Sequence, residues 1–205
     1  GMGVGLMGCG AVVPLGPIYA SQVLGSGSAG FGLLMTGLGT GAAIGVLALS
    51  VAARRLPSDL VFVTALFGSG IGLVLATSTS SLTAAVVLAG VFGLFAGTCY
   101  VSGFTVIQER VTDALRGRMF ATLYTIIRFC LLLSLAVSPW MAGLLDSISG
   151  AIFDDRVIEL GVRVRVPGVR LTFWLGGLMT VAAGVVVSRD ILRARGRTRH
   201  PSNGH

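Results

Sequence analysis

The sequence predicts an all-α integral membrane protein with six transmembrane helices. Of its 205 residues, 54% are hydrophobic and only 11% are charged, whereas a soluble domain carries about 25% charged residues. Six long apolar runs are separated by short polar segments, and basic segments alternate with neutral ones. A chain of this composition lacks the polar surface needed to cover itself in water, so we expect the lipid bilayer as its first partner.

Each apolar run is long enough to cross about 30 Å of hydrocarbon at about 1.5 Å per residue. Backbone polar groups in lipid need partners within their own segment, so we predict that all six runs are helices. Together they form one membrane domain over residues 1–188, followed by a basic cytoplasmic tail over 189–205. The predicted spans cover residues 3–24, 30–53, 59–77, 82–107, 119–145 and 169–188.

The arginines predict which side of the membrane each connection faces. Segments 25–29 and 77–81 carry no charge, whereas the connections that alternate with them are basic. Basic segments stay in the cytoplasm, so both termini should be cytoplasmic and the neutral segments should face outward from the cell membrane. The arginines that set this orientation in the two cytoplasmic loops are Arg54, Arg55, Arg110, Arg116 and Arg118.

One connection departs from this alternation. Residues 146–168 contain four acidic residues and three arginines, and by parity they lie outside. The stretch "VRVRV" (162–166) alternates apolar and charged residues, which is a strand pattern, and "RVIEL" precedes it with Gly161 between them. These residues predict a small external β-hairpin.

Catalytic and metal chemistry have no candidate residues. Cys9, Cys99 and Cys130 lie inside apolar runs without CxxC or Cys/His spacing, and His200 and His205 lie in the polar tail. There is no nucleophile–base pair and no phosphate-binding loop, so we predict neither an enzyme nor a cofactor. The net charge of +7 comes from arginines that lie mainly at the ends of the apolar runs. This placement is typical of the membrane boundary and does not favour nucleic-acid binding.

The second predicted helix carries a repeated GxxxG pattern. Gly37, Gly41 and Gly45 lie four residues apart, and this spacing allows a neighbouring helix to approach closely. Gly39, Gly41 and Gly45 also match a loose dinucleotide-binding pattern. No strand precedes them and no ribose-binding acid follows, so we favour helix packing.

Arg128 is the most unusual residue of the chain. It lies ten residues beyond Arg118 in a predicted span, which is about 15 Å along a helix and near the middle of the membrane. A charge at that depth is costly and suggests a function, although a structural arginine that binds helix-end carbonyls is the alternative. Tyr124 lies one turn away on the same face. No Asp or Glu lies in the middle of any predicted helix.

Two features resemble the C-terminal six-helix half of the major facilitator superfamily. They are a glycine-rich helix that ends in "AARR" and the segment "QERVTDALRGR" (108–118) between two later helices. The second pattern is similar to the drug-efflux branch that includes macrolide and enterobactin exporters. The resemblance covers nearly the whole chain and departs from the family at 146–168. It implies two inverted three-helix repeats.

The resemblance also implies a function, which is multidrug efflux by an antiporter. This half would rock against an N-terminal six-helix half, or a second copy, and export a small amphipathic organic molecule. We expect the chain to be a piece of a longer one, since it begins with Gly and not Met. The alternative is a membrane anchor or regulatory unit that tethers a fused soluble enzyme, such as a nucleotide kinase.

Two groups of residues take roles from this resemblance. The first and fourth helices would line the central cavity, and the alternative for each candidate on them is packing. The predicted substrate path, which includes the unusual arginine and its neighbour, consists of Tyr19, Phe95, Thr98, Tyr100, Tyr124 and Arg128. The residues expected to hold the cytoplasmic helix ends and the inward gate are Gln108, Arg110, Arg116 and Arg118, with Arg54 and Arg55 in the other basic loop.

Overall fold

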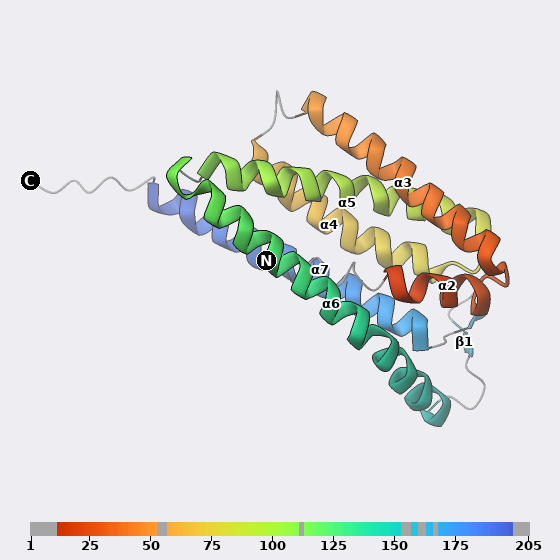
Figure 1. Ribbon diagram of the computed structural model, residues 1–205. Coiled ribbons are helices and arrows are strands. Elements are labelled where there is room, and N and C mark those ends of the chain that lie inside the picture. The colour runs from red at the N-terminus through yellow and green to blue at the C-terminus, as the bar shows by residue number, and fades with distance from the viewer. Residues whose placement is uncertain are drawn as a thin grey trace, which may run out of the picture.

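The computed structural model describes residues 12–52, 57–110, 113–152, 157–159, 163–165 and 168–198. Within these ranges the chain forms six helices and one two-stranded sheet (Figure 1). The helices are α2 (Val12–Gln22), α3 (Gly27–Ala52), α4 (Ser58–Ser78), α5 (Leu82–Arg110), α6 (Asp113–Ile152) and α7 (Gly168–Thr198). The strands are β1 (Val157–Glu159) and β2 (Arg163–Arg165).

The predicted fold class is confirmed. In the described residues, five helices are long and apolar enough to cross a membrane, namely α3 to α7. The first predicted span, 3–24, is described only from Val12 onward, where it forms α2. Gly25 and Gly27 take φ values of 61° and 54° in the turn between α2 and α3. Only glycine adopts this conformation without strain, which explains the glycines of the neutral connection.

Helices α6 and α7 extend beyond the apolar runs, although their membrane-spanning parts, Gly117–Leu144 and Gly168–Arg189, agree with the predicted spans 119–145 and 169–188. Helix α6 begins at Asp113 and ends at Ile152, so both ends of the predicted 119–145 span continue as helix into the adjoining connections. Helix α7 continues to Thr198, into the predicted tail. The added segments 113–118 and 189–198 are rich in Ala, Leu and Arg, which have high helix propensity, and apolarity alone does not reveal them.

The two strands lie within residues 146–168, the connection for which the sequence predicts an external β-hairpin. β1 and β2 pair antiparallel, with Val157 opposite Arg165 and Glu159 opposite Arg163. The rest of the predicted external segment either belongs to α6 or lies outside the described residues.

Helices α3 and α5 run parallel with their backbones in close approach. A methyl group at Gly37 would lie 2.7 Å from the carbonyl oxygen of Val86, and one at Gly97 would lie 2.8 Å from the carbonyl oxygen of Ala42. Gly41 and Gly45 follow Gly37 against the backbone of α5, facing Gly90 and Leu94. A side chain on any of these glycines would force the two helices apart, so the small residues set the distance between them.

Some of the other helix contacts are the same for α2–α4 as for α5–α7. Helix α5 packs on α3 and α4, while α2 packs on α6 and α7, and α4 lies antiparallel to α7. Exchanging α2–α4 with α5–α7 preserves these contacts, but the contacts of α2 with α3 and of α6 with α7 have no comparable counterpart. The two inverted three-helix repeats that the resemblance implies therefore stay a prediction. In Figure 1, α3 lies along one edge of the bundle and α6 with α7 along the other, with α4 and α5 between them.

The hydrophobic core lies toward the ends of the helices that are predicted to face outward. Its larger cluster includes Leu15, Tyr19, Leu73, Phe92 and Phe173. A smaller cluster of Phe62, Leu66 and Ala183 lies toward the opposite ends. The bundle is therefore packed most extensively near the connections without charge.

Candidate substrate path

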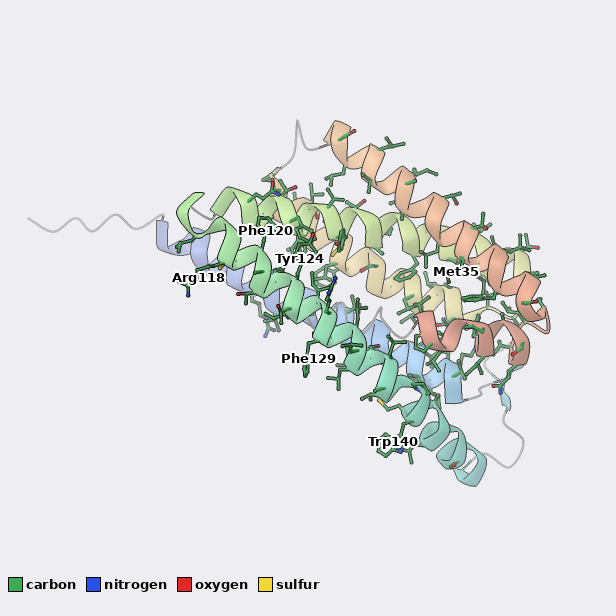
Figure 2. All side chains as sticks on the ribbon, in the orientation of Figure 1. Met35, Arg118, Phe120, Tyr124, Phe129 and Trp140 are labelled. Carbon is green, nitrogen blue, oxygen red and sulfur yellow. The ribbon has the colours of Figure 1, made fainter. Side chains whose placement is uncertain are left out.

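Helix α6 presents two different flanks on either side of its buried stripe. Ile127 and Ser134 are buried and mark the stripe that faces the bundle. One flank carries the exposed bulky apolar side chains Met119, Ile126, Phe129, Leu133 and Trp140. Figure 2 shows Phe129 and Trp140 pointing away from α5, while Phe120 and Tyr124 lie on the side toward it. The bulky flank is suited to lipid.

The other flank of α6 is small and polar over its first half. Gly117, Ala121, Tyr124, Thr125 and Arg128 are all exposed and fall on this side of the helix. The Thr125 hydroxyl donates to the Ala121 carbonyl, 2.9 Å away, and so needs no partner outside the helix. We call these five residues the polar flank. Small and polar residues in a membrane helix favour contact with protein or a cavity over lipid.

Four aromatic side chains connect α5 to the polar flank. Phe104 lies at their centre, with ring centroids 4.9 Å from Tyr100, 5.9 Å from Phe120 and 5.8 Å from Tyr124. Tyr100 is 44% exposed and Tyr124 is 50% exposed, whereas Phe104 and Phe120 are half-buried. We call these four residues the aromatic cluster. Each such ring pair contributes about 0.5–1.5 kcal/mol beyond the burial of area.

Phe104 and Phe120 were not among the path residues predicted from the sequence. The available signal was the spacing of Tyr100 with Phe104 and of Phe120 with Tyr124, each four apart, which puts two aromatic rings on one face of each helix. Two of the predicted path residues, Tyr100 and Tyr124, lie in one cluster because both contact the Phe104 ring.

An open groove borders the aromatic cluster on its other side. It lies between α3 and α5 and has a volume of about 570 Å³. Tyr100 lines both the groove and the cluster, so one exposed surface runs from α3 across α5 to α6. The residues that line the groove are Ala42, Ala43, Val46, Leu47, Gly97, Tyr100 and Val101.

Arg128 continues the line of Phe120 and Tyr124. The three residues lie four apart on α6, so their side chains follow one stripe of the helix. Arg128 is exposed, eleven residues into the span Gly117–Leu144, or about 16 Å along its axis. It makes no hydrogen bond or ion pair with the residues that the structure describes. The alternative expectation, a structural arginine that binds carbonyls, fits a different residue.

That residue is Arg170, whose side chain is fully buried at the start of α7. Its Nε donates to the Thr77 carbonyl at 2.6 Å, and its Nη2 donates to the carbonyls of Ser78 and Thr79 at 3.1 and 2.5 Å. Nη2 also lies 3.2 Å from Ser80 Oγ. Arg170 thus satisfies the last carbonyls of α4, which have no partner within their own helix.

Tyr19 belongs to the same group and not to the exposed surface. It is 4% exposed, and its hydroxyl donates to the carbonyls of Ala76 and Thr79 at 3.2 and 3.0 Å. Its ring packs edge-to-face on Phe173 with centroids 5.7 Å apart. Tyr19 was predicted from the sequence as a substrate contact, and no role was predicted for Arg170.

A small apolar cavity lies beside Tyr19. Its volume is about 50 Å³, and Leu73, Phe92 and Phe173 are among the side chains that line it. One water molecule needs about 10–15 Å³ measured this way. The cavity is therefore too small for an organic substrate.

The other two path candidates also lie inside the bundle. The Phe95 ring rests on Gly68 of α4, which has no side chain to displace it. The Thr98 hydroxyl donates to the Leu94 carbonyl at 2.8 Å and lies close to Gly45 of α3. Both residues are partly buried between neighbouring helices of this chain.

The predicted cytoplasmic residues fall at helix ends where they are described. Gln108 and Arg118 are exposed near the end of α5 and the start of α6. Arg110 is the last residue of α5 and Arg116 lies in the first turns of α6. Arg54 and Arg55, expected in the first basic loop, lie outside the described residues.

In the part of the chain that the structure describes, no three His, Cys, Asp or Glu side chains come together as a metal site would require. Neither the curated proteins nor the solved structures contain a match to this sequence. The family model of the Major Facilitator Superfamily matches residues 1–204. This match spans nearly the whole chain and agrees with its all-helical membrane fold. The chain belongs to the major facilitator superfamily, a family of membrane transporters.

Proposed function

We propose that this chain is one half of a secondary active transporter that exports a small amphipathic organic molecule by alternating access. The observation that carries the proposal is the exposed surface formed by the groove, the aromatic cluster and Arg128. Membership of the family supports transport in general. Export, and the kind of molecule, are our inference from the efflux-like segment 108–118 and from the chemistry of this surface.

The aromatic cluster suits the apolar part of such a molecule. Aromatic side chains bury large areas and impose few directional requirements, so they accept rings of different shapes. Tyr100 and Tyr124 each leave about half of their side chain uncovered by this chain. The bulky flank of α6 faces the other way, which leaves the cluster free to face a second half of the transporter.

The rest of the chain acts as one rigid body in this proposal. The glycine contacts fix α3 to α5, and Arg170 fixes α7 to the end of α4. Gln108, Arg110, Arg116 and Arg118 hold the cytoplasmic ends of α5 and α6 and help to close the inward gate. The partner is an N-terminal six-helix half or a second copy of the chain.

Ion coupling then requires a group from outside this chain. The sequence has no Asp or Glu between residues 60 and 108 or between 114 and 145. Proton-coupled transporters carry a carboxylate within the membrane. We therefore assign the antiporter carboxylate to the partner half. The alternative function, an anchor for a soluble enzyme, gains no support from the family match.

Dye export from intact cells tests the proposal. Cells that produce the full-length protein are loaded with rhodamine 6G or with fluorescein, and the rate of dye loss is compared with cells that lack the protein. The double variant Tyr100→Ala, Tyr124→Ala should export about tenfold more slowly, because a buried aromatic ring contributes roughly 1.5–3 kcal/mol.

The matched control removes two exposed aromatic rings from the opposite flank of α6, Phe129→Ala with Trp140→Ala. This variant should export at the rate of the unmodified protein. Equal losses in both double variants would remove the special role of the cluster. Dye loss no faster than in cells without the protein would overturn the proposal of export.

A further inference from the structure

We infer that the transported molecule is an organic anion, whose ring lies on the aromatic cluster while its carboxylate, sulfonate or phosphate group binds Arg128. This inference rests on the proposed function and names the substrate class of the same surface. It is carried by the position and exposure of one arginine and by its lack of partners among the described residues.

The charge balance of the described helices leaves Arg128 without a counter-ion. The nearest acidic residues along its own helix are Asp113 and Asp146, which are 15 and 18 residues away. These separations correspond to about 22 and 27 Å on a helix, far beyond the reach of an ion pair. The other apolar spans carry their acidic residues only at their ends. An anion at this depth must therefore come from outside the chain.

The contrast with Arg170 strengthens this reading. Both arginines lie within the apolar part of the chain, and both carry a planar fork of N–H donors. Arg170 is fully buried and uses its donors on the carbonyls at the end of α4. Arg128 is exposed and donates to none of the described residues. A guanidinium in that condition is suited to bidentate binding of a carboxylate or phosphate.

The neighbours of Arg128 specify the rest of the molecule. Tyr124 precedes it by one turn on the same stripe, and one turn rises about 5.4 Å. Phe104 holds the Tyr124 and Phe120 rings in place from α5. The arrangement fits a planar ring with an acidic group about one helical turn from it. The apolar groove beyond Tyr100 can accept further hydrocarbon.

Equilibrium binding separates charge from ring recognition. Fluorescein and rhodamine 6G share the xanthene ring system, but fluorescein is an anion and rhodamine 6G is a cation at neutral pH. Fluorescence anisotropy with the purified full-length protein in detergent measures both affinities. The unmodified protein should bind fluorescein at least about tenfold more tightly than rhodamine 6G, since hydrogen bonds to a charged group are the stronger ones.

Substitution of Arg128 should change only the binding of the anion. Arg128→Met should weaken fluorescein binding by about tenfold to a hundredfold and leave rhodamine 6G binding the same or stronger. Arg128→Lys keeps the charge but loses the fork, and should lie between the two. The control is Arg189→Met, which removes an exposed arginine at the end of the span Gly168–Arg189 and should bind both dyes as the unmodified protein does.

Three results would overturn the inference. One is equal or tighter binding of rhodamine 6G by the unmodified protein, and another is fluorescein binding that survives Arg128→Met. The third is a lower melting temperature of Arg128→Met together with equal weakening of both dyes, which would assign Arg128 to a carboxylate of the partner half. Export is measured separately, so rhodamine 6G export without fluorescein export would sustain the transporter and reject the anion.

Discussion

Arg170 donates a hydrogen bond to the carbonyl oxygen of Thr79, which lies 91 residues earlier in the chain. The bond joins the first turn of α7 to the residue that caps the C-terminal end of α4. Tyr19 of α2 donates to the same carbonyl. Three helices therefore meet at one helix end, next to the larger core cluster.

Removing the Arg170 donors should destabilise the protein. In Arg170→Met the carbonyls of Thr77 and Ser78 lose the guanidinium donor, and each costs about 1–3 kcal/mol when left unsatisfied in a buried place, whereas the Thr79 carbonyl keeps the Tyr19 hydroxyl as a donor. Thermal unfolding of the detergent-solubilised protein should show a clearly lower midpoint. Arg189→Met, an exposed arginine of the same helix, is the control. Equal midpoints for the two variants would contradict the capping role.

Tyr19→Phe should destabilise the protein less than Arg170→Met does and should leave substrate binding unchanged. It removes the hydroxyl bonded to Ala76 and Thr79 but keeps the ring on Phe173. The hydroxyl has a single proton, which the two carbonyls share, so the expected cost is about 0.5–1.5 kcal/mol of unfolding free energy in total. Since Tyr19 is buried within the chain, the KM for an exported dye should not change. A raised KM with unchanged stability would restore Tyr19 to the substrate path.

The contrast between Arg128 and Arg170 shows how far the sequence could predict the site. The sequence could single out Arg128 because it lies deep within an apolar run. The free-energy cost of a charge in the membrane depends on this depth, which the sequence alone gives. Arg170 lies only three residues into α7, where an arginine looks like an ordinary interfacial residue. Its role depends on the end of α4, about ninety residues away, and no local pattern records that contact.

The candidates on α2 and α5 illustrate the same limit. The resemblance placed Tyr19, Phe95, Thr98 and Tyr100 on helices that line a cavity, but a helix has several faces. The structure leaves only Tyr100 exposed among them. The face is decided by tertiary contacts, such as Gly68 beneath the Phe95 ring. Apolar length, by contrast, is a local property, and it predicted the five described spans well.

The glycine pattern of α3 allows a matched pair of substitutions. A methyl group at Gly41 would meet the backbone of Gly90, whereas one at Gly39 would lie in open space. Gly41→Ala should therefore push α3 from α5 and destabilise the protein by about 1–3 kcal/mol. Gly39→Ala should be neutral or slightly stabilising, since alanine favours a helix by up to about 1 kcal/mol. Thermal unfolding of both variants decides whether the register is as described.

The orientation of the bundle in the membrane decides whether the aromatic cluster lies nearer the cytoplasm or the outside. After the native cysteines are replaced, single cysteines at exposed Ser28 and Ser80 should react with an impermeant thiol reagent added to intact cells. Cysteines at exposed Pro57 and Gln108 should react only after the membrane is permeabilised. Arg54 and Arg55, which precede Pro57, and Arg110, which follows Gln108, should hold these positions in the cytoplasm.

This orientation puts the aromatic cluster in the cytoplasmic half of the membrane. Phe104 precedes Gln108 by one turn, and Phe120 follows Arg118 by two residues. The well-packed core with Tyr19 and Arg170 then lies in the outer half. A molecule entering from the cytoplasm would meet the rings before it reached Arg128. The opposite labelling pattern would put the rings and the groove toward the outside, and uptake would then be the direction that this surface favours.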